Sequence, residues 1–489
     1  MEKLTSWKNF CSVVLFCAFA AMAAHAQTFT SLLDFESTTG DGPEALVRGV
    51  DGNFYGVAWS GGSHLEGTAF RITPTGTLTT VYDFCSQSSC TDGANPQWLM
   101  LGIDGNLYGG TSQGGDPSCA GCGVILKLTD SGAFSVVYAF PLSSGARPWG
   151  LIQGVDGSLY GVANSGGAND YGSVFKLTTA GQLTVLHSFC SQAKCVDGSF
   201  PSGTLIQSGN GTLYGATESG GAKGIGTIYK LAPDGTFTTL HSFVGKDGSS
   251  PVMLMQGADN IIYGLTSNGG AIGQCPNSSV GCGTLFQITT AGQLTTLYSF
   301  CAQSGCADGT NPSTLVQGSD GNLYGGTSLG GVLSCGRYQD GCGTLFQFTS
   351  AGTLTTLHTF EATDGDSPNV LLQDTDGSFY GVTLNGGDVN LFSCSGGPGC
   401  GTVFNLSTGL GPFVTFTRNF GKVGQIGGIL GRGLIGTTAV WLNGTPASFT
   451  VVSDTSIRAT VPTGATSGLV TVQTPSGTLT SNTIFTVIP

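Results

Sequence analysis

Residues 156–161 read DGSLYG, and closely similar phrases ending in Tyr-Gly occur six more times along the 489-residue chain. The seven tyrosines are Tyr55, Tyr108, Tyr160, Tyr214, Tyr263, Tyr324 and Tyr380. Their spacings run from 49 to 61 residues. A period of about 50 residues with β-type patterning is typical of propeller blades, each of which has four strands. The phrase therefore predicts seven copies of one all-β unit.

The third repeat shows how one unit is built. A first strand is expected at 150–153, and Asp156-Gly157 is a strong hairpin signal. Three more strands are expected at 158–163, 172–177 and 182–189, because β-branched and aromatic residues alternate there between Gly-rich turns. No stretch has a sustained helical period. Each repeat is therefore expected to be a four-stranded antiparallel meander.

The seventh repeat has no fourth strand of its own after 401–406. A segment of the missing type stands instead before the first repeat, at 29–35. If this N-terminal strand completes the last sheet, the ring closes and its exposed edges disappear. We therefore predict a seven-bladed β-propeller closed by an N-terminal strand. An open β-solenoid is the alternative, although its rungs are usually shorter and need caps.

The meander also predicts two unequal faces of the ring. The turns between first and second strands and between third and fourth strands are short, and they lie on one face, the short-turn face. The other connections are long and variable, and they lie on the opposite face, the long-loop face. Because functional residues concentrate on variable loops, we expect any binding on the long-loop face.

Cysteine usage predicts disulfides on the long-loop face. Of the 16 cysteines, Cys11 and Cys17 precede the repeats. The other cysteines form seven close pairs: Cys85 with Cys90, Cys119 with Cys122, Cys190 with Cys195, Cys275 with Cys282, Cys301 with Cys306, Cys335 with Cys342 and Cys394 with Cys400. An even number of paired cysteines in a secreted chain indicates disulfides. A zinc site at Cys119 and Cys122 is disfavoured, because neither a second CxxC motif nor an adjacent His supplies the remaining ligands.

The N-terminus has the features of a signal peptide spanning residues 1–26. Lys3 and Lys8 precede an apolar run at 13–23, and Ala24-His25-Ala26 provides a small-x-small cleavage site. The apolar run is too short for a stable transmembrane helix, and no later segment is long enough. We therefore expect a secreted or cell-surface protein. The net charge of −13 and the pI of 4.6 disfavour nucleic acid and anionic membranes as partners.

The repeat motifs end near residue 408, and a different sequence pattern follows. The repeat region is assigned to 27–408 and a β-sandwich to 409–489, where short alternating strands are separated by Gly, Pro and Asn-Gly turns. Phrases such as Ala439-Val440-Trp441-Leu442-Asn443-Gly444 resemble those of IPT/TIG domains, which are immunoglobulin-like modules. That resemblance implies a spacer or adhesion unit and transfers no ligand residue.

The repeats themselves resemble the GloVer family of bacterial tandem repeats. The resemblance rests on the DG-x-LYG, GG, GT-x-F and LT-x-L-x-SF phrases and covers roughly residues 29–406. It implies an exported repeat protein and carries no established activity. The IPT/TIG-like module occupies the position where this family usually has an anchor, so covalent surface attachment is not expected.

Aromatic side chains near the long-loop face give the best binding signal. Trp98 and Trp149 follow prolines at the entry to first strands, and Trp59 precedes a Gly-Gly pair. Exposed aromatic rings could stack on sugar rings while Arg147 and nearby Asp and Asn bond to hydroxyls. The competing interpretation is that these tryptophans pack between blades.

No catalytic residues are identified in the sequence. His187, His241 and His358 share one repeat position with tyrosines, which favours packing over metal binding or acid–base chemistry. Five loop aspartates each precede Gly and favour turn capping over calcium binding, so no cofactor is expected. These residues are Asp92, Asp197, Asp247, Asp308 and Asp364.

We expect a non-catalytic binding or adhesion protein directed to an extracellular glycan or protein surface. The alternatives are a carbohydrate-active hydrolase or lyase with a propeller fold, and a purely structural repeat protein. Paired carboxylates facing one cleft would favour the enzyme. The oligomeric state stays open.

Overall fold

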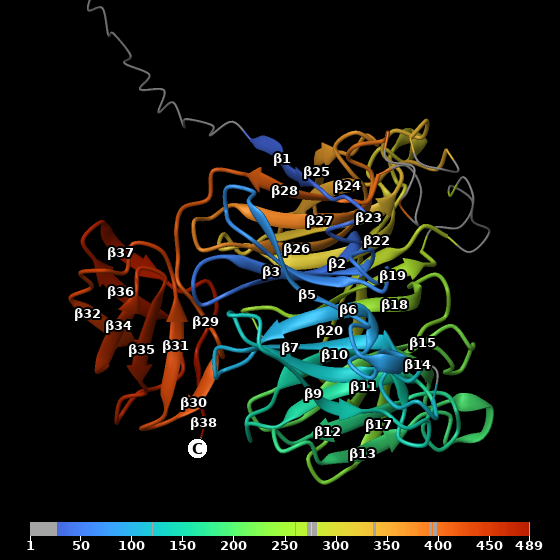
Figure 1. Ribbon diagram of the computed structural model, residues 1–489, viewed down its shortest axis with the longest axis horizontal. Helices are drawn as coiled ribbons and strands as arrows, with labels where there is room; N and C mark the ends of the chain where they lie inside the picture. Colours follow the sequence, from blue (N-terminus) through green and yellow to red (C-terminus); the bar gives the residue numbers. More distant parts are fainter. Residues whose placement is uncertain are drawn as a thin grey trace, which may run out of the picture.

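The computed structural model describes residues 27–119, 121–259, 261–270, 275, 281–335, 339–390, 394 and 399–488 (Figure 1). Within these ranges the chain is all-β, and its helices are three short 3₁₀ turns: η1 (Ser88–Cys90), η2 (Ala193–Cys195) and η3 (Ser304–Cys306). No helix in the described part of the chain is long and apolar enough to cross a membrane. The predicted signal peptide, 1–26, lies outside the described residues.

Strands β2 to β25 form six antiparallel sheets of four consecutive strands, numbered 1 to 6 in chain order. Sheets 1 to 3 are β2 (Asp41–Arg48), β3 (Phe54–Ser60), β4 (Thr68–Ile72), β5 (Leu78–Asp83); β6 (Ala94–Leu101), β7 (Leu107–Gln113), β8 (Val124–Leu128), β9 (Phe134–Ala139); and β10 (Ala146–Gln153), β11 (Leu159–Ser165), β12 (Ser173–Leu177), β13 (Leu183–Ser188). Sheets 4 to 6 are β14 (Ser199–Gln207), β15 (Leu213–Ser219), β16 (Thr227–Leu231), β17 (Phe237–Ser242); β18 (Ser249–Gln256), β19 (Ile262–Asn268), β20 (Thr284–Ile288), β21 (Leu294–Ser299); and β22 (Thr310–Gln317), β23 (Leu323–Leu329), β24 (Thr344–Phe348), β25 (Leu354–Thr359). The strands of the third repeat match their predicted positions, except that the first begins four residues earlier.

The seventh sheet takes its outer strand from the N-terminus. Its order is β1-β28-β27-β26, with β1 (Thr28–Asp34), β26 (Asp366–Gln373), β27 (Phe379–Asn385) and β28 (Thr402–Ser407). β1 is antiparallel to β28, with Phe29 opposite Leu406, as the sequence predicted. Each sheet contacts the next one along the chain, and β2 of sheet 1 contacts β26 and β27 of sheet 7. The seven sheets therefore form a ring by their contacts.

The Asp, Tyr and Gly residues of the repeated phrase each have a structural role. The Tyr55 hydroxyl donates to the Asp51 carboxylate at 3.0 Å, so the second strand holds the preceding hairpin turn. The same bond recurs at Tyr160 and Asp156. A Cβ at Gly56 would overlap the ring of Phe70 on the next strand. Glycine is therefore required where the third-strand aromatic crosses the second strand.

The C-terminal residues form a second body with its own core, the C-terminal module (409–488). One sheet contains β29 (Thr415–Phe416), β31 (Ile426–Leu430), β35 (Ser456–Thr460) and β34 (Phe449–Ser453). The other contains β33 (Thr445–Pro446), β32 (Ala439–Leu442), β36 (Val470–Thr474) and β37 (Gly477–Thr480), and β30 (Phe420–Lys422) pairs with β38 (Thr486–Ile488). Ile429 and Ile457 from one sheet share a buried core with Val440 and Val472 from the other.

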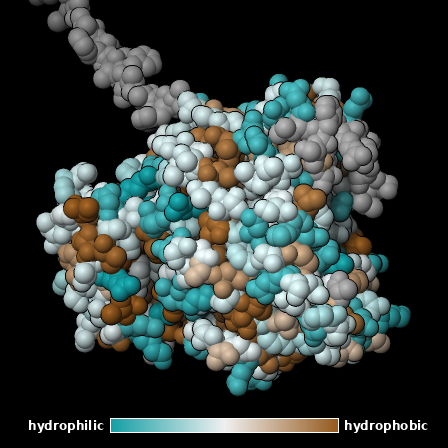
Figure 2. Space-filling view, in the orientation of Figure 1, coloured by the Kyte–Doolittle hydropathy of each residue, from teal (hydrophilic) through white to brown (hydrophobic). Residues whose placement is uncertain are grey.

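The C-terminal module lies against the short-turn face of the ring (Figures 1 and 2). Thr455 donates to the Val50 carbonyl at 2.7 Å, and the Arg48 guanidinium donates to the Gly431 carbonyl at 2.7 Å. Arg48 also bonds to Asp374, which is buried and accepts a second ion pair from Arg432 of the module. Asp374 therefore joins sheet 1, sheet 7 and the module at the point where the ring closes.

Candidate functional site

A central pocket of about 580 Å³ opens among the first strands of the seven sheets. In every sheet the residue that follows the first-strand proline lines this pocket. These seven residues are Glu44, Gln97, Trp149, Ser202, Val252, Ser313 and Asn369. The starts of first strands and the ends of second strands surround the pocket, so it lies toward the long-loop face, away from the C-terminal module.

A bulge turns several of these side chains toward the ring axis. In sheet 1 the strand register shifts between Pro43 and Ala45, which leaves Glu44 as the extra residue. Gln97, Val252, Ser313 and Asn369 occupy the same bulge position in their sheets. A β-bulge redirects the side chain of its extra residue and commonly lies beside functional sites. The repeat therefore supplies a ring of variable side chains on a fixed frame.

The residue before each first-strand proline fixes the strand's entry. It has a positive φ in every sheet, for example 54° at Arg147 and 54° at Asn95. Its N–H donates to a carbonyl of the preceding sheet, as Arg147 does to Cys122 at 2.9 Å. Gly42 makes the same bond to Cys400 at 3.0 Å and so links sheet 1 to sheet 7. Each proline is therefore held in place by the neighbouring sheet.

Glu44 is the pocket residue with the most perturbed carboxyl group. Its Oε2 accepts a bond from the Asn369 side-chain amide at 2.8 Å. Burial raises the pKa of Glu44 to about 7, and the Asn369 bond opposes that shift only in part. The pocket therefore favours the protonated form of Glu44 more than water does.

Glu218 is the second carboxyl group that lines the pocket. Burial of the Glu218 carboxyl group raises its pKa, and neither a hydrogen bond nor a nearby charge opposes that shift. No Lys, Arg or His is among the described residues that line the pocket. Glu44 and Glu218 come from sheets 1 and 4, and both line the same pocket.

The predicted binding residues separate into two groups in the structure. Trp149 lines the pocket and is 38% exposed, whereas Trp98 lines it as a packed wall residue that is 9% exposed. The Trp98 indole donates to the Pro148 carbonyl at 2.9 Å. Trp59 is 37% exposed but lies outside the pocket lining, as does the exposed Arg147. Sequence reasoning did not single out Glu44, Gln97 or Asn369, although their place directly after the repeat proline marks them.

The loops around the long-loop face are closed by disulfides. In the structure the sulfur atoms of all seven predicted pairs are bonded, and the Cα atoms of each pair lie 4.0 to 5.6 Å apart. Three pairs close loops that follow a fourth strand: Cys85 with Cys90, Cys190 with Cys195, and Cys301 with Cys306. Four pairs close loops that precede a third strand: Cys119 with Cys122, Cys275 with Cys282, Cys335 with Cys342, and Cys394 with Cys400. Every sheet of the ring except the fourth therefore carries at least one bonded pair in the loops that follow its strands.

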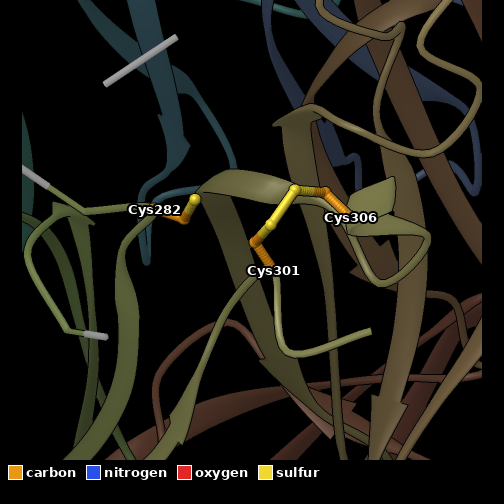
Figure 3. A group of neighbouring side chains, drawn as sticks. All are labelled: Cys282, Cys301 and Cys306. Atoms are coloured by element: carbon orange, nitrogen blue, oxygen red, sulfur yellow. A yellow bond between two sulfur atoms is a disulfide. The ribbon is translucent and has the colours of Figure 1, made fainter. Parts of the chain in front are cut away.

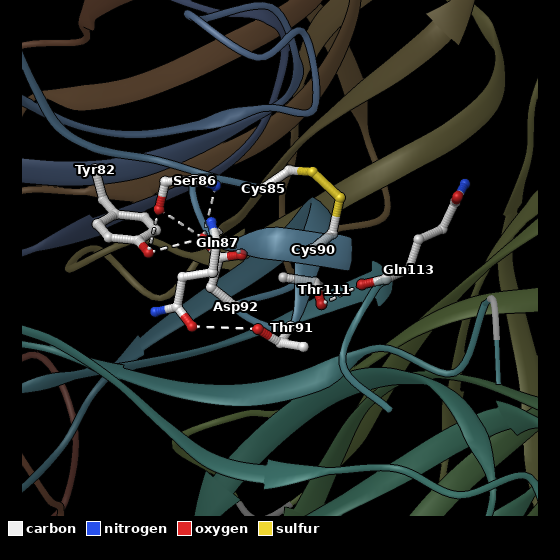
Figure 4. Close-up of a disulfide and its surroundings, with 9 residues drawn as sticks. All are labelled: Tyr82, Cys85, Ser86, Gln87, Cys90, Thr91, Asp92, Thr111 and Gln113. Atoms are coloured by element: carbon white, nitrogen blue, oxygen red, sulfur yellow. Dashed lines mark hydrogen bonds between the residues drawn. A yellow bond between two sulfur atoms is a disulfide. The ribbon is translucent and has the colours of Figure 1, made fainter. Parts of the chain in front are cut away.

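The first of these loops folds around a buried carboxylate. Figure 4 shows the Cys85–Cys90 loop surrounding Asp92, whose side chain is fully enclosed. Asp92 accepts bonds from the Tyr82 hydroxyl at 2.8 Å and from the Ser86 amide at 2.9 Å. The carboxylate therefore organises its own loop.

The three histidines form part of the same loop arrangement. His187, His241 and His358 each contact the loop aspartate that follows, at 3.2, 2.8 and 2.9 Å respectively. His187 also stacks on Phe237 of the next sheet, with ring centroids 3.9 Å apart. A histidine in this position therefore packs between sheets and positions a loop carboxylate.

Two disulfides of sheet 5 meet at one point. The sulfur of Cys282 lies within 4.8 Å of those of Cys301 and Cys306 (Figure 3). Each of these cysteines is already bonded, Cys282 to Cys275 and Cys301 to Cys306. A metal site here would need both disulfides to be reduced, because the thiolate is the metal-binding form of cysteine.

An acidic cleft of about 430 Å³ separates the ring from the C-terminal module. Asp51 and Asp104 line it, and both are bound within their own hairpins. Asp104 accepts bonds from Tyr108 at 3.1 Å and from Lys127 at 2.8 Å. Asp51 and Asp104 therefore stabilise their turns, in contrast to the carboxyl groups of the central pocket.

Comparison with solved structures reports on the fold. Virginiamycin B lyase from Staphylococcus aureus matches with a TM-score of 0.51 and 14% identity over 78% of this chain and 99% of that chain. A protein described as the extracellular domain of a hybrid two-component system from Bacteroides thetaiotaomicron matches with a TM-score of 0.51 and 10% identity. The latter match covers 94% of this chain and 58% of that chain. At these identities the likeness concerns the fold alone.

Sequence comparison places the repeats in a family. No curated protein matches the chain. The family model of the Gloeobacter/Verrucomicrobia repeat matches residues 19–122, 99–338 and 276–437, which together cover well over half of the sequence. The chain therefore belongs to the Gloeobacter/Verrucomicrobia repeat family.

Proposed function

We propose that this protein is an exported, non-catalytic binding protein whose central pocket takes a glycan. The single observation that carries the proposal is Trp149, which is 38% exposed and lines a pocket that polar side chains otherwise dominate. An exposed indole beside amide, hydroxyl and carboxyl groups suits a sugar, which has apolar ring faces and polar edges.

In this proposal the seven sheets are the blades of a β-propeller in residues 27–408, closed by β1. Residues 409–489 are an IPT/TIG-like module of the immunoglobulin-like class. The four-stranded sheets, their ring of contacts and the two-sheet core of the module support these assignments. Because the module covers the short-turn face, the central pocket is left open on the long-loop face.

Export is part of the same proposal. Residues 1–26 serve as the signal peptide, and the mature chain works outside the cell or at its surface. Seven bonded cysteine pairs support an oxidising compartment, because such bonds are rare in reducing ones. The likeness to the extracellular domain of a two-component system is compatible with this location.

A glycan array followed by titration calorimetry on the mature protein tests the proposal. Trp149→Ala is expected to reduce the affinity for any bound glycan at least tenfold. Trp59→Ala is the matched control, because Trp59 has nearly the same exposure and lies outside the pocket. Absence of glycan binding, or equal effects of the two substitutions, would reject the proposal.

One observation favours a second candidate, a glycoside hydrolase. Glu44 and Glu218 line one pocket, and the raised pKa of Glu44 suits a general acid. Release of reducing sugar from a bound glycan, abolished by Glu44→Gln, would support the enzyme. Binding without turnover over a prolonged incubation would support the non-catalytic function.

A further inference from the structure

Several hydrogen-bond donors of the central pocket are engaged by the protein itself. The Ser202 hydroxyl donates to the Pro251 carbonyl at 2.7 Å, and the Ser313 hydroxyl donates to the Pro368 carbonyl at 2.6 Å. The Asn369 amide is engaged by Glu44, and the Trp98 indole by Pro148. These bonds tie neighbouring sheets together, so a ligand cannot use those donors without loosening the ring.

Three acceptor groups of the pocket residues, on Gln97, Glu218 and Glu44, have one hydrogen-bond partner between them. Gln97 Oε1 is buried and has no hydrogen-bond partner. Glu218 contacts no donor or cation among the described residues, and Glu44 has Asn369 as its one side-chain partner. An unpaired buried acceptor is costly, so a ligand that supplies donors gains affinity by satisfying it. Gln97 and Glu44 lie on the neighbouring first strands β6 and β2, which contact each other.

We infer that the glycan bound in the central pocket is an amino sugar with a free, protonated amine. An ammonium group supplies three donors and one positive charge, and it has no acceptor. Such a group suits a pocket whose described lining includes two carboxyl groups and no Lys, Arg or His. The inference rests on the proposed glycan binding and specifies its ligand class.

The aromatic side chain of the site favours the same ligand. Trp149 follows Pro148 in sheet 3 and lines the pocket with Glu44 and Gln97. A tryptophan face attracts a cation more strongly than the other aromatic side chains do. A neutral sugar can use Trp149 by stacking, but it leaves both carboxyl groups without a counter-charge.

Three β-1,4-linked tetrasaccharides of equal length separate the possibilities: the glucose, N-acetylglucosamine and glucosamine tetramers. Their affinities for the mature protein are measured by calorimetry at pH 7 and physiological ionic strength. The glucosamine tetramer is expected to bind roughly tenfold or more tightly than the other two, because charge-assisted hydrogen bonds are the stronger class.

Charge-removing variants locate the effect in the pocket. Glu44→Gln and Glu218→Gln together are expected to bring the affinity for the glucosamine tetramer down to that for the glucose tetramer. Glu361→Gln is the matched control, because it removes one charge from an exposed residue of the long-loop face outside the pocket lining. It is expected to leave all three affinities unchanged.

The outcomes distinguish the inference from the proposed function. If the neutral tetramers bind in a Trp149-dependent manner and the amine adds nothing, the amino-sugar inference is wrong and glycan binding stands. If Glu361→Gln weakens binding as much as the pocket variants, the preference comes from overall charge and the inference is also wrong. If no glycan binds at all, both fail.

Discussion

The two ends of the ring handle carboxyl groups in opposite ways. At the short-turn face, Asp374 is fully enclosed and is shared by two arginines, one from the first sheet and one from the C-terminal module. At the opposite end, Glu44 and Glu218 line a pocket that offers them no cation among its described residues. Two arginines of the chain neutralise the buried Asp374 carboxylate at the junction. The described pocket lining supplies no cation for Glu44 or Glu218. The difference supports a structural role for Asp374 and is the basis for proposing a binding role for Glu44 and Glu218.

The largest expected effect comes from removing the compensated charge. Asp374→Asn leaves two guanidinium groups facing each other, and we expect it to cost about 3–5 kcal/mol of unfolding free energy. Chemical denaturation followed by fluorescence measures this cost. Asp376→Asn is the control, because Asp376 is partly exposed and lies 3.6 Å from Arg432, so it should cost less than about 1 kcal/mol. Equal costs would show that the junction is not special.

The two pocket tryptophans should separate packing from binding. Trp98→Ala removes a buried indole and its bond to Pro148, with an expected cost of about 3–5 kcal/mol. Trp149→Ala removes a side chain that is more than a third exposed, with an expected cost of about 1 kcal/mol or less. Thermal unfolding of both variants tests this order. A Trp149 variant as unstable as the Trp98 variant would assign Trp149 to the core.

Glu44→Gln should stabilise the protein, in contrast to the substitution at Asp374. Folding raises the pKa of this carboxyl from 4.5 to about 7, so its contribution to stability is full below pH 4.5 and is lost as the pH rises to 7. The amide keeps an acceptor for Asn369 and has no charge to desolvate. We expect a gain of about 2–3 kcal/mol at pH 8 and almost none at pH 4. A gain that does not change with pH would contradict this explanation.

Removing one loop disulfide should cost less stability than removing the junction carboxylate or the buried Trp98 indole. Cys190→Ser combined with Cys195→Ser opens a loop with a sequence separation of 5, which should cost about 2 kcal/mol. The equivalent double substitution at Cys85 and Cys90 opens a loop of the same length and should cost the same. A loss well above this value in calorimetric unfolding would mean that these bonds hold the ring together rather than its loops.

Local features of the sequence were sufficient to predict most of the strands. Hairpin signals such as Asp156-Gly157 and the repeated Tyr-Gly phrase act within one repeat, so their consequences do not depend on distant residues. The N-terminal strand was predicted because the seventh repeat lacks one. Because these motifs repeat seven times along the chain, each strand could be identified by comparing one repeat with the others.

The pocket and the junction depend on departures from the pattern. Glu44 is one of seven residues at one repeat position, and its side chain reaches the axis because of a bulge that no single repeat predicts. Arg48 stands where five other repeats have glutamine, and it finds Asp374 across 326 positions of sequence. Such contacts require the register of the folded strands, which composition and spacing do not supply.

The pairing of β1 with β28 has a consequence for how the chain reaches its native state. Thr28 precedes all seven sheets along the chain, and its partner Ser407 lies in the seventh sheet. The two strands can therefore pair only after nearly the whole ring has been synthesised. Folding is therefore expected to be slow and to finish with this step, which leaves the edge of β28 exposed until the end. The first strand of the described chain is therefore expected to be the last strand to pair.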